Sequence, residues 1–202
     1  TDLRAEEQIC AYLQQDGCNA RERIRKGQFV FLEKEQAYLR GGVFDPEAMI
    51  AFLRAAEAQA AAEGYAALRV SGEMSWALRG MPGSERLIEY EARLNEFLPA
   101  SRCIALCQYD MRRFDPRTLL DVLRTHPVAV VGADVYDNFY YIPPEEFLSP
   151  AGQQAAILRN WLSSLAAYRR ETAQLMSAML DHTPSLIVYM DTDFNILRVN
   201  RA

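Results

Sequence analysis

The stretch CIALCQYD at residues 103–110 decides the fold class. Most of it is an apolar run of strand length, and its only charged residue, Asp110, comes where that strand would end. Asp115-Pro116 then predicts the capped start of a helix, and Val128–Val131 predicts a second strand. Open α/β sheets bind their ligands at the carboxyl ends of the strands. Asp110 is therefore expected at the edge of the sheet where a ligand site would lie.

Helices and strands alternate in the same way before this stretch. A helix is predicted over residues 2–15 and a strand at Phe29–Leu32. An alanine-rich helix then runs from Pro46 to Gly64, and a strand follows at Leu68–Gly72. The next helix presents one apolar stripe, formed by Leu87, Tyr90, Leu94 and Phe97. Alternation at these lengths predicts an α/β fold of three layers, with helices on both faces of a mostly parallel sheet.

The pattern changes near residue 150, and it divides the chain into three parts. Residues 1–149 form the expected α/β core, which is short of one βα unit for a complete doubly wound sheet. Residues 150–182 predict one long helix, and residues 183–202 predict two short strands that form a truncated β-hairpin. Apolar residues of the helix follow alternating spacings of three and four, with Thr172 as the interruption: Leu158, Trp161, Leu165, Tyr168, Leu175 and Met179. This heptad period predicts a coiled coil that joins two copies in a homodimer, and the alternative is a helix that packs back on its own sheet.

Composition and charge narrow the possible functions. Half of the 202 residues are apolar, and the net charge of −5 argues against a nucleic-acid-binding surface, which needs a basic face. No apolar run approaches the roughly 18 residues that cross a bilayer, and no secretory leader is visible in the sequence. We therefore expect a cytoplasmic protein that binds neither nucleic acid nor a membrane.

The cysteines predict free thiols. Cys103 and Cys107 share one face of a predicted strand, and about 13 Å separates two residues at that spacing, which is too far for a disulfide. Buried thiols in a reducing cytoplasm are the expectation, and a redox role is the alternative. Because the chain has only two histidines, we expect neither a metal site nor a cofactor.

Three blocks of the sequence resemble the MEDS domain, the methanogen/methylotroph sensory domain named from the DcmR regulator: AYLRGGVFDP at 37–46, LRVSGEMSW at 68–76, and residues 103–148. The resemblance implies a fold related to RecA/KaiC-type ATPases with degenerate nucleotide chemistry. It also implies an input role that involves small hydrocarbon-derived molecules. Members of the family usually carry an upstream unit with a histidine-aromatic segment, and this sequence lacks it. Residues 180–200 resemble the opening of a PAS domain, and this order of parts resembles that of sensor histidine kinases and related regulators.

Five residues are candidates for ligand binding: Glu73, Trp76, Tyr109, Asp110 and His126. Glu73 and Asp110 each follow a predicted strand, so their carboxylates flank one edge of the sheet if those strands are neighbours. Trp76 and Tyr109 suit an apolar pocket for a small ligand, and they suit core packing equally well. His126 precedes a proline at the end of a helix, where a hydrogen bond that stabilises the turn is the alternative to a chemical role.

We expect no catalytic residues, because neither a placed nucleophile nor a glycine-rich lysine loop accompanies the two acids. The sequence instead predicts a sensory input domain that relays a population shift through the dimerising helix. Two alternatives stay open. One is a divergent RecA/KaiC-like ATPase, and the other is a protein-interaction module that recruits a regulatory partner.

Overall fold

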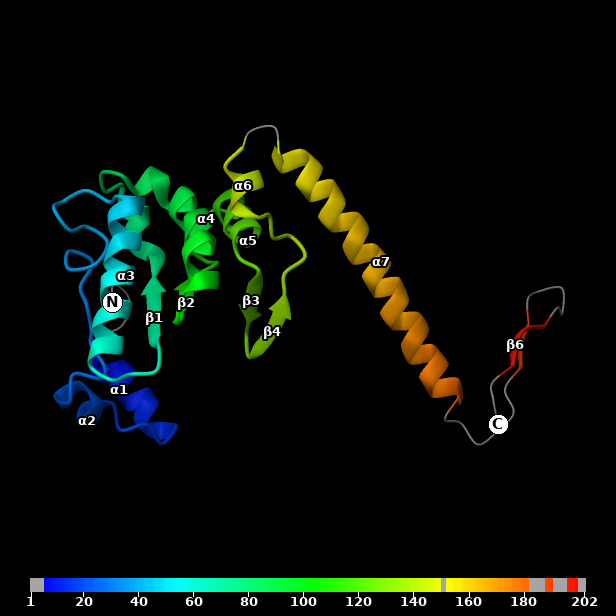
Figure 1. The fold of residues 1–202 in the computed structure, drawn as a ribbon, viewed down its shortest axis with the longest axis horizontal. Coiled ribbons are helices and arrows are strands. Elements are labelled where there is room, and N and C mark those ends of the chain that lie inside the picture. The colour runs from blue at the N-terminus through cyan, green and yellow to red at the C-terminus, as the bar shows by residue number, and fades with distance from the viewer. Residues whose placement is uncertain (1–5, 150–151, 182–187, 191–195, 200–202) are drawn as a thin grey trace. The chain divides into compact units, whose positions relative to one another are not determined.

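The structure, a computed structural model, describes residues 6–149, 152–181, 188–190 and 196–199. They belong to two compact units, Thr1–Gln153 and Gln154–Ala202 (Figure 1). The first unit holds a mixed α/β core. The second holds most of one long helix and a β-hairpin.

Two short helices, α1 (Glu6–Gln15) and α2 (Ala20–Arg25), come first in the chain. The structure confirms the predicted N-terminal helix, but the strand predicted at Phe29–Leu32 is wrong. The backbone there forms no strand ladder, and Val30 is 63% exposed. An apolar run of four residues becomes a strand only where a neighbouring strand edge can pair with it, and none of the described strands pairs with this run.

The centre of the first unit is a βαβ unit. Strands β1 (Leu68–Glu73) and β2 (Cys103–Gln108) pair in parallel over their full lengths. The connection between them contains helix α4 (Leu87–Phe97), and helix α3 (Pro46–Ala62), which precedes β1, packs on α4 (Figure 1). Three short 3-10 helices complete the connection: Met74–Arg79, Ser84–Arg86 and Leu98–Ala100.

Helices cover one face of this sheet within the described residues. The side chains of Cys103 and Cys107 lie on the covered face, whereas Ile104 and Leu106 on the opposite face are 61% and 48% exposed. The fold is thus mixed α/β with a small parallel sheet. Alternating strands and helices predict the βαβ unit well, but they do not specify how many strands pair side by side, so the three-layer RecA-like arrangement stays a prediction.

The predicted stripe of α4 forms the centre of the hydrophobic core. Its four residues are at most 4% exposed: Leu87, Tyr90, Leu94 and Phe97. The ring of Phe44 packs edge-on against Tyr90, with ring centres 5.5 Å apart, and is tilted against the ring of Trp76, with centres 4.9 Å apart. Aromatic contacts of this kind add to the burial of apolar area, so the stripe and the segments before α3 and after β1 stabilise one another.

Capping residues begin α3 and α5 (Pro116–Thr125) where the sequence predicts. Asp45 accepts the N–H of Ala48 at 2.8 Å. Asp115 accepts the N–H groups of Arg117 and Thr118 at 3.0 and 3.1 Å. Each cap satisfies backbone donors that the first helical turn leaves open.

The strand predicted at Val128–Val131 forms, but it belongs to a hairpin that is a separate antiparallel sheet. β3 (Val128–Val131) pairs with β4 (Asp134–Asp137) across a turn with Gly132 at φ 66°. Neither strand pairs with β1 or β2, so the hairpin does not extend the parallel sheet. Helix α6 (Pro144–Phe147) follows it and is the last helix that lies wholly in the first unit.

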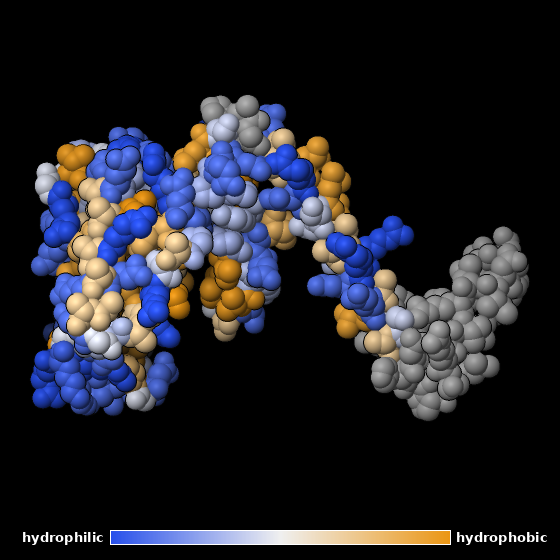
Figure 2. Space-filling model, viewed as in Figure 1, coloured by the Kyte–Doolittle hydropathy of each residue, from blue (hydrophilic) through white to orange (hydrophobic). Residues whose placement is uncertain are grey.

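The second unit contains the long helix α7 (Gly152–Asp181) and an antiparallel pair, β5 (Val188–Met190) with β6 (Ile196–Val199). The sequence predicts two short strands within residues 183–202, and both are present, although residues 182–187 and 191–195 lie outside the described residues. Figure 2 shows hydrophobic and hydrophilic residues interspersed along α7. The predicted dimerisation residues Leu158, Trp161, Leu165, Tyr168 and Leu175 are all exposed, and the side chain of Met179 lies outside the description.

Candidate functional site

The two predicted acids each have a local partner. Glu73 accepts the backbone N–H and the hydroxyl of Ser75 at 2.9 and 2.7 Å. Asp110 accepts Nε and a terminal nitrogen of Arg112 at 2.9 and 2.8 Å. These hydrogen bonds from Arg112 lower the pKa of Asp110 to about 2. Each carboxylate therefore stabilises the turn that follows its own strand.

Trp76 lies in the core with 1% of its surface exposed. Its ring stacks on Tyr38 with the ring centres 5.0 Å apart. The indole Nε1 is buried and has no hydrogen-bond partner among the described residues. Burial raises the pKa of Tyr38, so its hydroxyl is protonated at neutral pH. For Trp76 the geometry is that of core packing, with one donor left unsatisfied.

Tyr109 and His126, the other two predicted residues, meet at Glu91. Glu91 lies in the middle of α4, and its carboxylate is fully buried. Tyr109 donates its hydroxyl hydrogen to Oε1. Oε2 lies 3.2 Å from Sγ of Cys107 and 3.4 Å from Nε2 of His126. We refer to Glu91, Cys107, Tyr109 and His126 as the Glu91 cluster.

Three elements bring the Glu91 cluster together. Helix α4 contributes Glu91, and β2 contributes Cys107 near its carboxyl end. Tyr109 is the first residue after β2, and His126 caps the C-terminus of α5. The cluster thus lies at the carboxyl end of a parallel strand, the edge of the sheet where the sequence predicts a ligand site.

Burial shapes the protonation of the cluster. It raises the pKa of the Cys107 thiol and of the Tyr109 hydroxyl well above their ordinary values, and the charge of Glu91 raises both further. Both groups therefore carry their hydrogens at neutral pH and donate them to the carboxylate. These hydrogen bonds offset part of the cost of burying a carboxylate away from water.

The ring of His126 is oriented through its other nitrogen. Nδ1 lies 2.7 Å from the carbonyl oxygen of Val122, which can only accept, so Nδ1 carries a hydrogen. In the neutral ring Nε2 then holds a lone pair, and it faces Oε2 of Glu91. Two acceptors 3.4 Å apart repel each other unless a proton or a metal ion lies between them. The arrangement therefore calls for one positive species between Nε2 and Oε2.

Two asparagines fix the end of α5 against the rest of the site. Asn95 of α4 donates its side-chain amide to the carbonyl of Thr125 at 2.6 Å. Asn138, which follows β4, donates to the carbonyl of His126 at 2.7 Å. Because these half-buried amides satisfy the last carbonyls of the helix, they also hold His126 in position.

Our sequence interpretation missed Glu91, although one signal could have located it. Glu91 lies four residues after Leu87 and three before Leu94, so it falls on the buried stripe of α4. A charged residue on a buried helix face needs partners, and it is therefore a candidate for a site.

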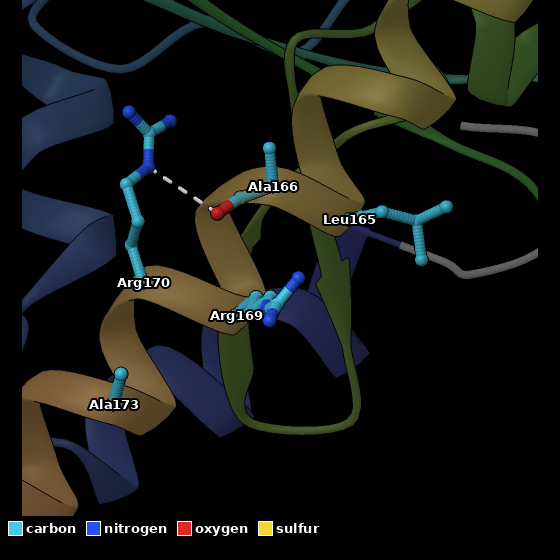
Figure 3. Close-up of a pocket in the computed structure, with 5 residues that line it drawn as sticks. All are labelled: Leu165, Ala166, Arg169, Arg170 and Ala173. Carbon is cyan, nitrogen blue, oxygen red and sulfur yellow. Dashed lines mark hydrogen bonds between the residues drawn. The ribbon is translucent and has the colours of Figure 1, made fainter.

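A hollow on α7 offers no comparable site. It is lined by Leu165, Ala166, Arg169, Arg170 and Ala173 (Figure 3). Nε of Arg170 donates to the carbonyl of Ala166 at 3.2 Å, and Leu165 projects to another side of the helix (Figure 3). All five residues come from one helix, so the hollow is an open helix face and not an enclosed cavity for a ligand.

Comparison with known proteins identifies the class of this domain. Residues 1–127 match the family described as MEDS, the methanogen/methylotroph, DcmR sensory domain. The chain belongs to this family, as the sequence motifs predict.

A curated regulatory protein is also similar to part of this chain. The transcriptional repressor DcmR of Methylorubrum extorquens (strain DSM 6343 / CIP 106787 / DM4) is 39% identical over 64 residues. The match covers 31% of this chain and 24% of the repressor, so the chain spans only a minor part of that relative. No solved structure matches the chain. Within the described residues, no helix combines the length and the apolar character that a membrane crossing needs.

Proposed function

We propose that this chain is the sensory input region of a cytoplasmic signal-transduction regulator and that the Glu91 cluster detects the signal. Membership of the MEDS family and similarity to a transcriptional repressor support a sensory and regulatory role. The observation that carries the proposal is the convergence of Cys107, Tyr109 and His126 on one fully buried carboxylate. Such a network is sensitive to the loss of any member, so a ligand that replaces one partner shifts a conformational equilibrium.

The proposed ligand is a small hydrocarbon derivative with one polar group. Its polar group would replace a donor on Glu91, and its carbon part would pack on the neighbouring aromatic rings. The hydroxyl of Tyr38 lies against Gly72, which is the partner of Cys107 in the parallel strand pair, so this ring lies near the cluster. Tyr38 in turn stacks on Trp76, whose buried Nε1 is unsatisfied. Apolar walls with a few convergent polar groups are typical of sites for small ligands.

Thermal unfolding of the whole chain with methanol, methylamine or chloromethane tests this proposal. These probes are one-carbon compounds, which the description of the family as methanogen/methylotroph suggests. We expect at least one probe to raise the Tm of the unaltered chain and of Tyr136→Phe, a control on the exposed hairpin. The same probe should raise the Tm of Tyr109→Phe by more, because in that variant its polar group fills a vacant place on Glu91 and displaces no donor. If no probe shifts the Tm, or if both variants respond alike, the proposed ligand site is wrong.

We further propose that α7 transmits the signal as a dimeric coiled coil in a sensor histidine kinase or related regulator. The exposed apolar residues at heptad spacing support this step, since exposed apolar stripes on a helix favour pairing. The antiparallel pair of β5 and β6 supports the assignment of residues 183–202 as the start of a PAS domain.

Light scattering after size exclusion tests the relay. The unaltered chain should elute as a dimer, and Leu165→Asp or Leu175→Asp should elute as a monomer, because each places a charge in the seam. Ser163→Asp is the matched control, since Ser163 is exposed on the same helix outside the heptad positions. A monomeric unaltered chain, or seam variants that stay dimeric, would contradict the coiled coil.

A second candidate function is that of a protein-interaction module, because the β3–β4 hairpin exposes Val130, Val131 and Val135 at 53%, 60% and 69%. Replacing Val131 and Val135 with Thr should then abolish co-purification of a partner from the native cell and leave the Tm nearly unchanged. The ATPase alternative receives no such support, because Glu73 and Asp110 each have a local partner.

A further inference from the structure

We propose that Glu91, Cys107 and His126 form a site for one divalent transition-metal ion, of which Zn²⁺ fits best. The three offer Oε2, Sγ and Nε2 as ligand atoms, which all lie within 4.8 Å of one another. The residues come from α4, β2 and the end of α5, so the folded core itself assembles them. This inference goes beyond the proposed detection of a small molecule.

The two distances from Oε2 of Glu91 are close to those of a tetrahedral zinc centre. Usual zinc–ligand distances and a tetrahedral angle require about 3.4 Å between oxygen and nitrogen, and about 3.6 Å between oxygen and sulfur. In the structure Oε2 lies 3.4 Å from Nε2 and 3.2 Å from Sγ. A small outward movement of the sulfur would therefore accommodate the ion.

The neighbouring hydrogen bonds are those that orient metal ligands. The carbonyl of Val122 binds Nδ1 of His126, which leaves Nε2 as the nitrogen with the lone pair. Tyr109 donates to Oε1 of Glu91, which leaves Oε2 free for the ion. Protein metal sites usually have such partners behind the ligand atoms, because these partners fix the tautomer and the orientation of each ligand. Tyr109 is thus a positioning residue of the proposed site.

Charge and softness both favour a transition metal. A divalent ion bound to a carboxylate, a thiolate and a neutral imidazole gives a site with no net charge, which suits a buried position. On binding, the ion replaces the hydrogen of the Cys107 thiol, which leaves to water as a proton, and it takes the place between Oε2 of Glu91 and Nε2 of His126 that calls for a positive species. A thiolate ligand favours zinc over magnesium or calcium, and three protein ligands leave the fourth tetrahedral position open for a small molecule.

Cobalt titration of the whole, metal-free chain under reducing conditions tests the site. We expect one equivalent of Co²⁺ to produce a thiolate-to-cobalt charge-transfer band and the visible bands of a four-coordinate ion, and Zn²⁺ to displace it. Cys107→Ser and His126→Gln should each weaken binding more than tenfold. Tyr109→Phe should weaken it about tenfold, as expected for a partner behind the ligand.

Cys103→Ser is the matched control, because Cys103 lies four residues earlier on the same face of β2 and belongs to no potential metal group among the described residues. This variant should keep the charge-transfer band. A second measurement uses the unaltered chain, in which Zn²⁺ should slow alkylation of Cys107 and leave that of Cys18 unchanged. No saturable band, a full band in Cys107→Ser, or no protection of Cys107 would each overturn the site. The thermal shifts with one-carbon probes, repeated with zinc and with a chelator, test ligand detection separately.

Discussion

Replacing Glu91 tests how much of the stability of the first unit depends on its cluster. Glu91→Ala leaves the Tyr109 hydroxyl and the Cys107 thiol without their acceptor in a buried place. An unsatisfied buried group costs about 1–3 kcal/mol, and the cavity left by the side chain adds to this. We therefore expect Glu91→Ala to lower the free energy of unfolding by about 3–5 kcal/mol in the presence of a chelator.

Glu91→Gln separates the hydrogen bonds from the charge. Its amide oxygen can accept the Tyr109 hydroxyl, and its amide nitrogen can donate to Nε2 of His126, which faces Oε2 in the unaltered chain. Only the weak thiol donor loses its acceptor, so we expect a change within about 1 kcal/mol.

Urea unfolding followed by the fluorescence of Trp76 measures both variants. The chain has two tryptophans, and Trp161→Phe in α7 removes the second, so that the signal reports on the first unit alone. A loss below about 1 kcal/mol in Glu91→Ala would show that the cluster does not stabilise the core. A Gln variant as unstable as the Ala variant would show that the charge, and not the set of hydrogen bonds, holds the cluster together.

Three further predictions concern single residues of the first unit. In Gly72→Ala the new methyl group overlaps the Tyr38 hydroxyl, so urea unfolding should show a loss of about 1–3 kcal/mol, and adding Tyr38→Phe should recover much of it. Asp45→Ala removes an N-cap and should cost about 1–2 kcal/mol, whereas Asp45→Asn keeps the capping oxygen and should cost less than half as much. NMR titration should find the pKa of Asp110 at about 2, and Arg112→Ala should raise that pKa towards its ordinary value. Because the pKa is lower in the folded than in the unfolded chain, ionised Asp110 stabilises the fold fully above the unfolded pKa. This contribution is lost as the pH falls through about 2.

Local signals explain why the elements around the site could be predicted. Asp45 and Asp115 each precede a proline, and this pairing predicts where a helix begins regardless of what packs on it. The stripe of α4 has a period that only a helix satisfies. The strand prediction at Phe29–Leu32 failed because a strand must pair with another segment that is distant in the chain. The local sequence of this apolar run does not determine whether such a segment lies beside it.

The difference between local signals and contacts of distant segments also explains which residues of the candidate site could be predicted. Tyr109 and His126 could be proposed because each lies next to a predicted element boundary, where side chains reach the edge of a sheet. Their common partner lies 18 residues from Tyr109 along the chain, in another element. Proximity across elements depends on how helices pack, and periodicity within one element does not determine it. Glu73 and Asp110 also lie where a predicted strand ends. Their carboxylates accept hydrogen bonds from Ser75 and Arg112, two residues later in the chain.

The position of the cluster also bears on how a signal could leave it. The carbonyls at the end of α5 accept hydrogen bonds from beyond the hairpin: that of His126 from the Asn138 side chain at 2.7 Å, and that of Arg124 from the N–H of Ile142 at 2.7 Å. Ile142 is 1% exposed and lies two residues before α6, so it cannot move independently of the core. A proton, metal ion or ligand that repositions the His126 ring therefore acts on the segment that precedes α6 through hydrogen bonds and not through a flexible loop. Because such bonds have few alternative arrangements, the proposed detection at Glu91 would act as a choice between discrete states, which is what a sensory domain requires.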